Sequence, residues 1–515
     1  EADAILNTYG NHPSFVMMAY GNEPGGDNQN AYLTKFIDHF RSKDTRRVYT
    51  GGAGWPYLKN MDYYNNSAPR IQGWGQELES IINKEPPQTQ FDFNAINNSI
   101  PMPYVSHEIG QWCVYPNFKE IEKYDGVLKA HNFEIFQESL IKNHLGHLSD
   151  SLMLASGKLQ ALCYKADIEA ALRTKDFAGF QLLDLHDFPG QGTALVGVLD
   201  AFWDEKGYIT PQEYRQFCSE TVPLARLDKR IFLNNETLKA YVEVAHYGEK
   251  PLSDIVPTWA LSDKNGVLFA KGRLPKANIP IGNGFKLGVV SVDLNKSENA
   301  QKLILTVGIG EHKNSWDIWV YPSQNEPIAK VDQMMVVQKF DERTINYLKN
   351  GGKVLLNITK GDIAPKKGGD IGVGFSSIFW NSSWTKGQKP HTLGILANPE
   401  HPALAEFPTE YHSNWQWWDA MSHSNAMVLD EFTPDLQPII RIIDDWFENR
   451  RTALLFEVKI GNGKLLVSGI DLHSDLAQRP EARQLLYSLK KYMSSDQFNP
   501  AITMESDDIK SLFTY

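Results

Sequence analysis

The chain has 515 residues, of which 42% are hydrophobic and 22% are charged, and its formal net charge is −11. This length exceeds what one core uses and predicts two to four globular domains. The negative charge gives no general support for nucleic-acid binding. No apolar run reaches the length of about 18 residues that a membrane span needs, so none is expected.

The first 14 residues resemble the end of a helix and a turn that leads into a strand. No signal peptide is visible, and we expect the natural N-terminus to lie upstream or to have been cleaved. Three cysteines are too few for a disulfide framework, and their apolar neighbours predict small buried side chains. A capping box that begins at Thr210 predicts the start of a helix.

Residues 1–225 alternate between apolar runs and helical patterns, which predicts a parallel sheet, either doubly wound or a barrel. A long helical region covers about 118–173, with breaks expected near Gly146 and Gly157. Five strands do not close an eight-stranded barrel, so a barrel requires three further strand–helix units outside this sequence. The expected strands lie near 15–20, 47–50, 70–73, 103–107 and 177–185.

Two β-rich and mixed regions follow. Residues 226–325 contain short alternating runs, with Asn265-Gly266 as a hairpin signal, and predict an immunoglobulin-like β-sandwich. Residues 330–495 return to α/β and predict a flavodoxin-like or amidotransferase-like accessory domain with an antiparallel edge. Asp341 is its expected N-cap. Residues 496–515 are polar and are expected to form a loose tail.

Two apolar runs stop at a glutamate: "FVMMAYGNEPG" at Glu23 and "PYVSHEIGQW" at Glu108. Carboxylates at the C-terminal ends of parallel barrel strands occupy the rim where barrel active sites form. Two such groups can cleave a glycosidic bond, one as a protonated acid and the other as a nucleophile. The plain alternative is that both are ordinary acids at loop edges.

The stretch "NHPSFVMMAYGNEPG" resembles the acid/base motif of glycoside hydrolase family 2, a family of retaining (β/α)8-barrel glycosidases. The resemblance implies that Glu23 is the acid/base at the end of the fourth barrel strand, and that Asn22 binds the sugar 2-hydroxyl. Counting on, Glu108 ends the seventh strand and is the implied nucleophile. The chain would then hold barrel strands four to eight, followed by the sandwich that family members carry.

Other residues near the expected barrel mouth are candidates for substrate binding. Trp55, Trp74 and Trp112 follow the expected fifth, sixth and seventh strands and could form a platform for a sugar ring, or pack in loops. His107 is expected to point away from Glu108 along the strand, with burial as the equal alternative. His186 and Asp187 follow the eighth strand and could bind substrate hydroxyls.

The leading interpretation is a retaining, exo-acting β-glycosidase of the β-galactosidase, β-glucuronidase or β-mannosidase type. Its partner is an oligosaccharide or glycoside, it needs no cofactor, and it is periplasmic or extracellular, with the cytoplasm as the alternative. A homo-oligomer is compatible with the sequence. The competing interpretation is a non-catalytic carbohydrate-binding or scaffold protein derived from such an enzyme.

Nucleotide and metal chemistry have weaker support. The run "GGDIGVG" at 368–374 is not clearly flanked by a strand and a helix, so it does not predict a dinucleotide loop. No His-Glu-x-x-His or paired Cys-x-x-Cys spacing predicts a metal site. Three tryptophans in the run "EYHSNWQWWD" at 410–419 are expected to pack against the sandwich or the barrel, with contact to carbohydrate as the alternative.

Overall fold

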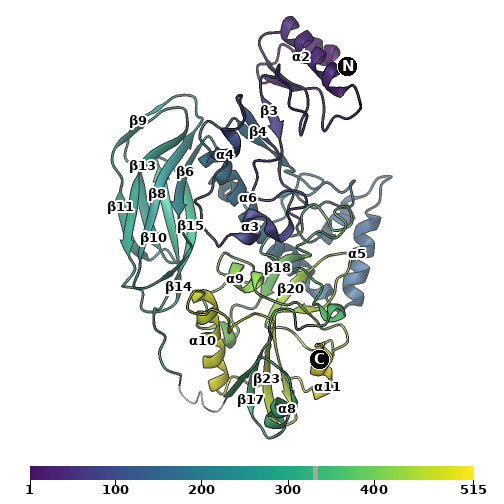
Figure 1. The fold of residues 1–515 in the computed structure, drawn as a ribbon, viewed down its shortest axis with the longest axis vertical. Helices are drawn as coiled ribbons and strands as arrows, with labels where there is room; N and C mark the ends of the chain where they lie inside the picture. Colours follow the sequence, from purple (N-terminus) through teal and green to yellow (C-terminus); the bar gives the residue numbers. More distant parts are fainter. Residues whose placement is uncertain (329–333, 515) are drawn as a thin grey trace.

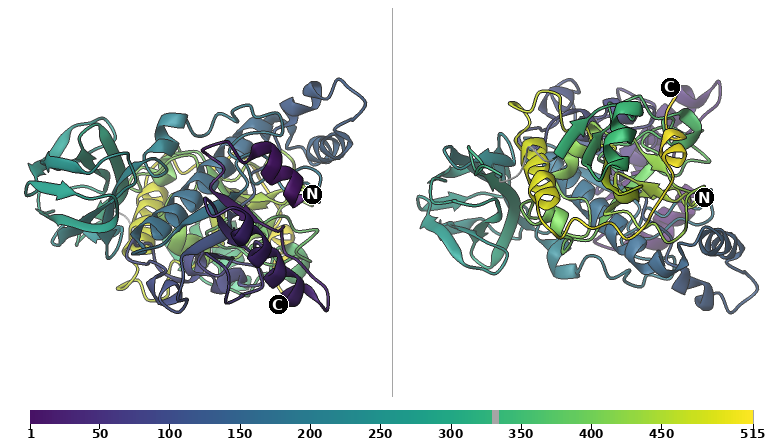
Figure 2. Two further views of the ribbon diagram at one scale, coloured as in Figure 1. Left: turned by 90° about the horizontal axis from the view of Figure 1, so that it is seen from above. Right: turned by 90° about the horizontal axis from the view of Figure 1, so that it is seen from below.

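A computed structural model describes residues 1–328 and 334–514 (Figure 1). Residues 330–333 of the predicted C-terminal domain and residue 515 of the predicted tail lie outside the described residues. The described chain is a mixed α/β protein with several separate sheets. A β-sandwich projects from one side of the body, and the first segment of the chain forms a lobe at one end (Figures 1 and 2).

Two small parallel sheets occupy the predicted barrel portion. β1 (Met17–Ala19) pairs with β2 (Val48–Thr50), and β4 (Tyr104–Gly110) lies between β3 (Tyr64–Asn66) and β5 (Gly179–Leu183). In the part of the chain that the structure describes, no ladder joins β2 to β3 and the strands do not close a barrel. Of the five predicted strands, four lie where expected, and a barrel is not shown.

One of those strands lies elsewhere than predicted. Residues 70–72 form bends, and the strand beside β4 is β3, which begins six residues earlier. Two backbone N–H groups of this segment donate to side chains instead of a ladder, and Arg70 N donates to Ala68 O at 3.0 Å. Ile71 N donates to Asp167 Oδ1 at 3.1 Å, and Gly73 N donates to Gln76 Oε1 at 2.7 Å. This segment thus leaves the sheet and frees its side chains for other contacts.

The longest helix, α6, packs against β4, β5 and the C-terminal strand β18 (Thr392–Ala397). The predicted break at Gly157 is wrong because the helix runs through it. A Cβ atom there would lie 2.2 Å from the Tyr208 ring, so glycine permits close packing. The Thr210 capping box is confirmed. The helical elements of this part are α1 (Ala2–Tyr9), α2 (Gln29–Lys43), η1 (Glu77–Glu79), α3 (Ile81–Lys84), α4 (Asn94–Asn97), η2 (Phe118–Lys123), α5 (His131–Lys142), η3 (Gly146–Leu148), α6 (Ser149–Arg173) and α7 (Pro211–Arg215).

The next part is a sandwich of two largely antiparallel sheets around a shared apolar core. It begins at Thr221, slightly before the predicted boundary, and the Asn265-Gly266 hairpin between β10 and β11 is confirmed. Its finer immunoglobulin-like assignment stays a prediction. One sheet has the order β13 (Gly282–Asp293), β8 (Thr237–His246), β6 (Thr221–Leu227); the other has β11 (Leu268–Arg273), β10 (Thr258–Ser262), β14 (Gln301–Ile309), β15 (His312–Tyr321), β7 (Ile231–Leu233); β9 (Leu252–Ile255) pairs with β12 (Ala277–Ile279).

The C-terminal part is built on a six-stranded mixed sheet. Only β16, β17 and β23 run parallel, so the antiparallel portion is larger than the edge expected from the sequence. The tight turn at Gly461 makes β22 and β23 a hairpin and imposes this direction. The sheet order is β16 (Met334–Val337), β17 (Lys353–Asn357), β23 (Gly463–Ser468), β22 (Leu455–Ile460), β20 (Ile440–Asp444), β18; β19 (Met427–Val428) pairs with β21 (Thr452–Ala453).

Helices cover this sheet, and α8 is capped as predicted by the Asp341 side chain, which accepts from Thr344 N at 2.9 Å. The run at 368–374 neither follows a strand nor opens a helix. The helical elements are α8 (Glu342–Lys349), η5 (Pro365–Lys367), η6 (Pro402–Leu404), α9 (Trp417–Ser422), α10 (Pro480–Ser494) and α11 (Ser506–Lys510).

The C-terminal tail is packed, against expectation. Lys459 N donates to Ile502 O at 2.8 Å, and Met504 N donates to Lys459 O at 3.0 Å, which ties the tail to β22. Ile509 and Leu512 are buried in the core beneath the sheet. These apolar residues at helical spacing in a polar segment explain why the tail folds back. In the described residues, no helix is long and apolar enough to cross a membrane.

The three predicted packing tryptophans are buried. Trp418 Nε1 donates to Ile82 O at 3.0 Å, which joins the C-terminal part to the N-terminal one. Trp415 lies beneath the guanidinium of Arg230, 4.9 Å from its ring centroid, which joins it to the sandwich. Trp417 Nε1 donates to Thr409 Oγ1 at 2.8 Å. The prediction that these rings pack against the sandwich or the barrel portion is confirmed for Trp415 and Trp418, whereas Trp417 contacts Thr409 and Phe407 within the C-terminal part.

Candidate active site

The two glutamates lie where parallel strands end. Glu23 follows β1, and its N–H donates to Ala53 O at 2.9 Å, which continues the alignment of β1 with β2. Glu108 lies in the last three residues of β4. Both have left-handed backbones, with φ of 45° for Glu23 and 58° for Glu108. Side-chain-bearing residues rarely adopt this conformation, and such strain concentrates at functional sites.

The backbone at Glu108 also changes the direction of His107. The register between β4 and β5 shifts between Ser106 and Ile109, as in a β-bulge. A bulge interrupts the alternation of side chains, so neighbours can face the same way. His107 Nε2 lies 3.1 Å from Glu108 Oε1, so the expectation that the two side chains point apart is wrong.

Glu23, His107 and Glu108 form a compact trio. One side-chain ligand atom from each lies within 4.8 Å of the other two. Glu23 is exposed, Glu108 is partly exposed, and His107 is only 4% exposed. The carboxyl groups of retaining glycosidases lie about 5–5.5 Å apart, so this spacing leaves no room for a water between the pair. The site combines two reachable carboxylates with a buried imidazole.

The electrostatics distinguish Glu23 from its partner. Partial burial raises the pKa of Glu23, and the negative charge of Glu108 raises it further. His107 and Arg70 oppose this effect. A carboxyl with a raised pKa keeps its proton to higher pH, which suits a general acid.

Arg70 and Gln111 support Glu108, although neither was a candidate from the sequence. Arg70 Nη1 donates to Glu108 O at 2.9 Å and to Gln111 Oε1 at 3.2 Å. Gln111 Nε2 in turn donates to Glu108 Oε2 at 3.3 Å. Arg70 lies in the segment predicted to be a strand. A regular strand gives no reason to expect its side chain to reach the backbone of Glu108. Gln111 could have been noticed as a polar residue just after the strand.

The other side of His107 is also ordered by polar groups. Asn65 Nδ2 donates to Gln181 Oε1 at 2.8 Å, and the same oxygen lies 3.4 Å from His107 Nδ1. If Nδ1 carries the proton, Nε2 presents a lone pair toward the Glu108 carboxylate. Within the described chain, His107 Nε2 is buried and lacks a hydrogen-bond partner. Two lone-pair acceptors, His107 Nε2 and a Glu108 oxygen, would then face each other, and a proton or a cation between them would join them.

The trio therefore has the chemistry to hold a divalent cation, since imidazole and carboxylate are common ligands. The sequence predicted no metal site because its three residues come from two distant segments. A search for close ligand spacing cannot detect such a group. No metal is needed for the hydrolysis that the carboxylate pair could perform.

The predicted tryptophans occupy different environments. Trp55 is exposed and its Nε1 donates to Pro24 O at 2.8 Å, directly after Glu23. Trp74 is also exposed and meets the Phe379 ring edge-on. Trp112 is fully buried, so the structure assigns it to packing and the predicted sugar contact is wrong there. Its position after β4 directs it into the core, where its Nε1 donates to a buried glutamine.

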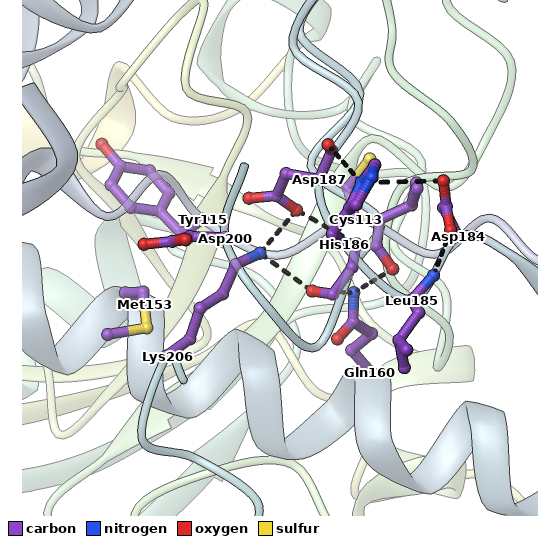
Figure 3. Close-up of polar contacts among 12 residues, drawn as sticks. Cys113, Tyr115, Met153, Gln160, Asp184, Leu185, His186, Asp187, Asp200 and Lys206 are labelled. Carbon is purple, nitrogen blue, oxygen red and sulfur yellow. Dashed lines mark hydrogen bonds and ion pairs between the residues drawn. The ribbon is translucent and has the colours of Figure 1, made fainter. Parts of the chain in front are cut away.

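The last candidates belong to a buried polar network and to the loop beside Glu23. Asp187 is 2% exposed and binds Lys206 Nζ at 2.6 Å (Figure 3). Burial raises its pKa to about 6, against the opposing Lys206 charge. Asp187 is thus a structural residue, contrary to prediction. His186 is half-buried and contacts the Trp203 ring, whereas Asn22 is exposed beside Glu23. Among the described residues, no hydrogen bond or ion pair joins His186 or Asp187 to the glutamate pair.

Comparison with known proteins leaves the family open. Residues 335–514 match a domain of unknown function (DUF8487), and residues 236–322 match another (DUF8488). These models together name no activity, and each covers less than half of the chain. No curated protein matches.

Three solved structures have limited similarity. An FMN-binding β-glucuronidase from Facaelibacterium prausnitzii L2-6 is 14% identical, with 64% of this chain and 44% of that chain covered and a TM-score of 0.27. Bacteroides uniformis β-glucuronidase 3 is 13% identical, with 62% of this chain and 38% of that chain covered and a TM-score of 0.26. The CARDB domain of PF1109 from Pyrococcus furiosus is 10% identical, with 20% of this chain and 94% of that chain covered and a TM-score of 0.16. This chain spans less than half the length of either glucuronidase, and TM-scores this low carry no argument about its fold or activity.

Proposed function

We propose that this chain carries the catalytic carboxylates of a retaining glycoside hydrolase that acts on the ends of β-linked glycosides. The observation that carries the proposal is the approach of Glu23 and Glu108 to within 4.8 Å, together with the raised pKa of Glu23. The short separation suits direct attack on the sugar. The resemblance of the Glu23 segment to glycoside hydrolase family 2 supports the same roles.

In the first step, Glu108 attacks the anomeric carbon while Glu23 gives its proton to the departing glycosidic oxygen. A bond forms between Glu108 and the sugar, and the bond to the aglycone breaks. In the second step, Glu23 takes a proton from water, whose oxygen attacks the same carbon and releases Glu108. The hydrogen bond from Gln111 orients the Glu108 carboxylate for the attack.

Binding of the sugar falls to groups around the pair. Exposed Trp55, fixed by its bond to Pro24 O, offers an aromatic face close to Glu23. Asn22 is exposed beside it and can bind a hydroxyl. A carbohydrate-binding or scaffold protein without catalysis is the alternative, since the described strands do not close a barrel around the pair.

Variants of the two glutamates separate these functions. With aryl β-glycosides, Glu108→Ala is expected to lose nearly all hydrolysis. Glu23→Ala is expected to lose much less, because a good leaving group needs little protonation. Azide should rescue Glu23→Ala with retained configuration and Glu108→Ala with inverted configuration. Binding without turnover by the wild type would favour the scaffold, and exchanged azide products would refute the assigned roles.

The close grouping of His107 Nε2 with one oxygen of each glutamate favours a second candidate, a hydrolase in which the trio holds a divalent cation. Metal analysis of the purified protein and turnover after treatment with a chelator distinguish the two candidates. The carboxylate mechanism predicts full activity without metal. Loss of activity in chelator, with recovery on adding Zn²⁺ or Mg²⁺, would support the cation instead.

A further inference from the structure

A second site lies where the three parts of the chain meet. A cavity of about 310 Å³ is bordered by α6, by strands β14 and β15 of the sandwich, and by residues 410–415 of the C-terminal part. Its volume is within the range of small-molecule sites. Apolar side chains such as Leu162, Phe217 and Trp316 form part of its lining. None of its lining residues belongs to the glutamate site.

Four cationic side chains line this cavity, and three of them are matched by carboxylates. Lys158 lies 3.8 Å from Glu213, and Lys302 lies 3.2 Å from Asp317 and also pairs with Glu410. Lys165 lies 2.8 Å from the Glu169 carboxylate beneath the cavity. These pairs neutralise the lysines and leave the fourth cation, Arg230, as the exception.

Arg230 is 5% exposed, yet no ion pair with a carboxylate is found for it in residues 1–328 and 334–514. Its Nη1 donates to the main-chain oxygen of Asp317 at 3.1 Å, and its Nε is buried without any hydrogen-bond partner. The Trp415 ring covers its guanidinium. Burial lowers its pKa to about 10, against the opposing charges of Glu169 and Asp317, which leaves it charged at neutral pH. A buried charge without a direct ion-pair partner is costly, and guanidinium binds carboxylate and phosphate well.

We infer that this cavity binds a small anion, a carboxylate or phosphate on a compact apolar body, with Arg230 as its counter-ion. The anion supplies the directly contacting counter-charge that Arg230 lacks, and the apolar body packs against the Trp316 and Phe217 side of the lining. Because the lining comes from all three parts, the ligand also joins them. The site is independent of the function proposed for the glutamates.

Binding of benzoate and of phenyl phosphate, measured by calorimetry and by thermal unfolding, tests the inference. Benzyl alcohol and benzylamine carry similar rings without the negative charge and serve as controls. At least one anion should bind at one site per chain and raise the melting temperature. The arm that binds more tightly distinguishes carboxylate from phosphate. Equal binding of the neutral or cationic ring, or no binding of either anion in the millimolar range, would overturn the inference.

Two variants and one matched control locate the binding. Arg230→Met should weaken anion binding about 10- to 100-fold, the range for loss of a charge-assisted hydrogen bond. Arg273→Met makes the same change at an exposed position on β11 and should bind like the wild type. If Arg230→Met does not fold, Ala161→Glu on α6 places a bulky carboxylate in the cavity and should abolish anion binding. Wild-type anion affinity in folded Arg230→Met or in folded Ala161→Glu would refute the assigned site.

Discussion

Glu120 in η2 is predicted to destabilise the folded chain as the pH rises. Its side chain is almost fully buried, and both carboxylate oxygens lack hydrogen-bond partners among the described residues. Burial raises its pKa from 4.5 to about 8, and the charges of Asp187 and Asp200 add to this rise. Lys206 and Lys123 act in the opposite direction. The folded protein therefore holds a proton on Glu120 that the unfolded chain releases near pH 4.5.

The sign follows from proton linkage. Below pH 4.5 Glu120 carries a proton in both states and does not lower the free energy of unfolding. As the pH rises from 4.5 to about 8, only the unfolded chain releases this proton, so the free energy of unfolding falls. At about 1.4 kcal/mol per pH unit, the loss is at most about 5 kcal/mol. Glu120→Met removes the titrating group while keeping a side chain of similar length. Its stability should therefore fall less with pH than that of the wild type.

Urea unfolding of both proteins at about pH 5 and about pH 9 measures this difference, because other titrating groups contribute equally to both. We expect the stability difference between variant and wild type to move by about 3–5 kcal/mol in favour of the variant between these pH values. Glu122→Met makes the same change at an exposed position of η2 and should follow the wild type. Parallel pH curves for Glu120→Met and the wild type would refute the reasoning.

Three further predictions concern a buried ion pair, the packing beside β4 and the glutamate pair. Lys206→Met leaves the Asp187 carboxylate buried and unpaired, and should lower the free energy of unfolding by about 3–5 kcal/mol, with Asp187→Asn restoring part of it. Full stability in the single variant would contradict this. Gly110→Ala, at φ 104° and with its Cβ 2.4 Å from the Tyr164 ring, should cost about 1–3 kcal/mol in thermal or urea unfolding. Gly126→Ala, with open space around it, is the control and should cost much less. Glu108→Gln should lower the pKa of Glu23 in a carbon-13 NMR titration, because it removes a charge that raises that pKa; an unchanged pKa would show that the two groups do not interact.

The local features of the chain were predictable because their signals lie in neighbouring residues. Caps at Thr210 and Asp341 satisfy helix N–H groups within three residues, and both are confirmed. The apolar runs before Glu23 and Glu108 are strands, as predicted. Burial on both faces is confirmed for β4, but in β1 only Met18 is buried and Met17 is exposed. Their roles in catalysis stay predictions.

Features set by distant contacts were not predictable. Gly157 looked like a helix break because only the fold places the Tyr208 ring against it. His107 was assigned to the wrong face because a bulge, which depends on pairing with β5, turned it toward Glu108. Trp112 follows β4 but is fully buried, because contacts with distant segments direct it into the core. The periodicity of the sequence predicts a regular helix or strand. It contains no information on a bulge or on contacts with distant segments.

Covalent trapping of Glu108 is the most direct test of the central claim. Dinitrophenyl 2-deoxy-2-fluoro-β-glycosides of galactose, glucose, mannose and glucuronic acid react to form slowly hydrolysed glycosyl-enzymes in a retaining mechanism. Mass spectrometry of the intact chain and of its peptides should show one added sugar on the peptide that contains Glu108, and none in Glu108→Gln. An adduct that persists in Glu108→Gln, or no adduct with any of the sugars, would contradict the account.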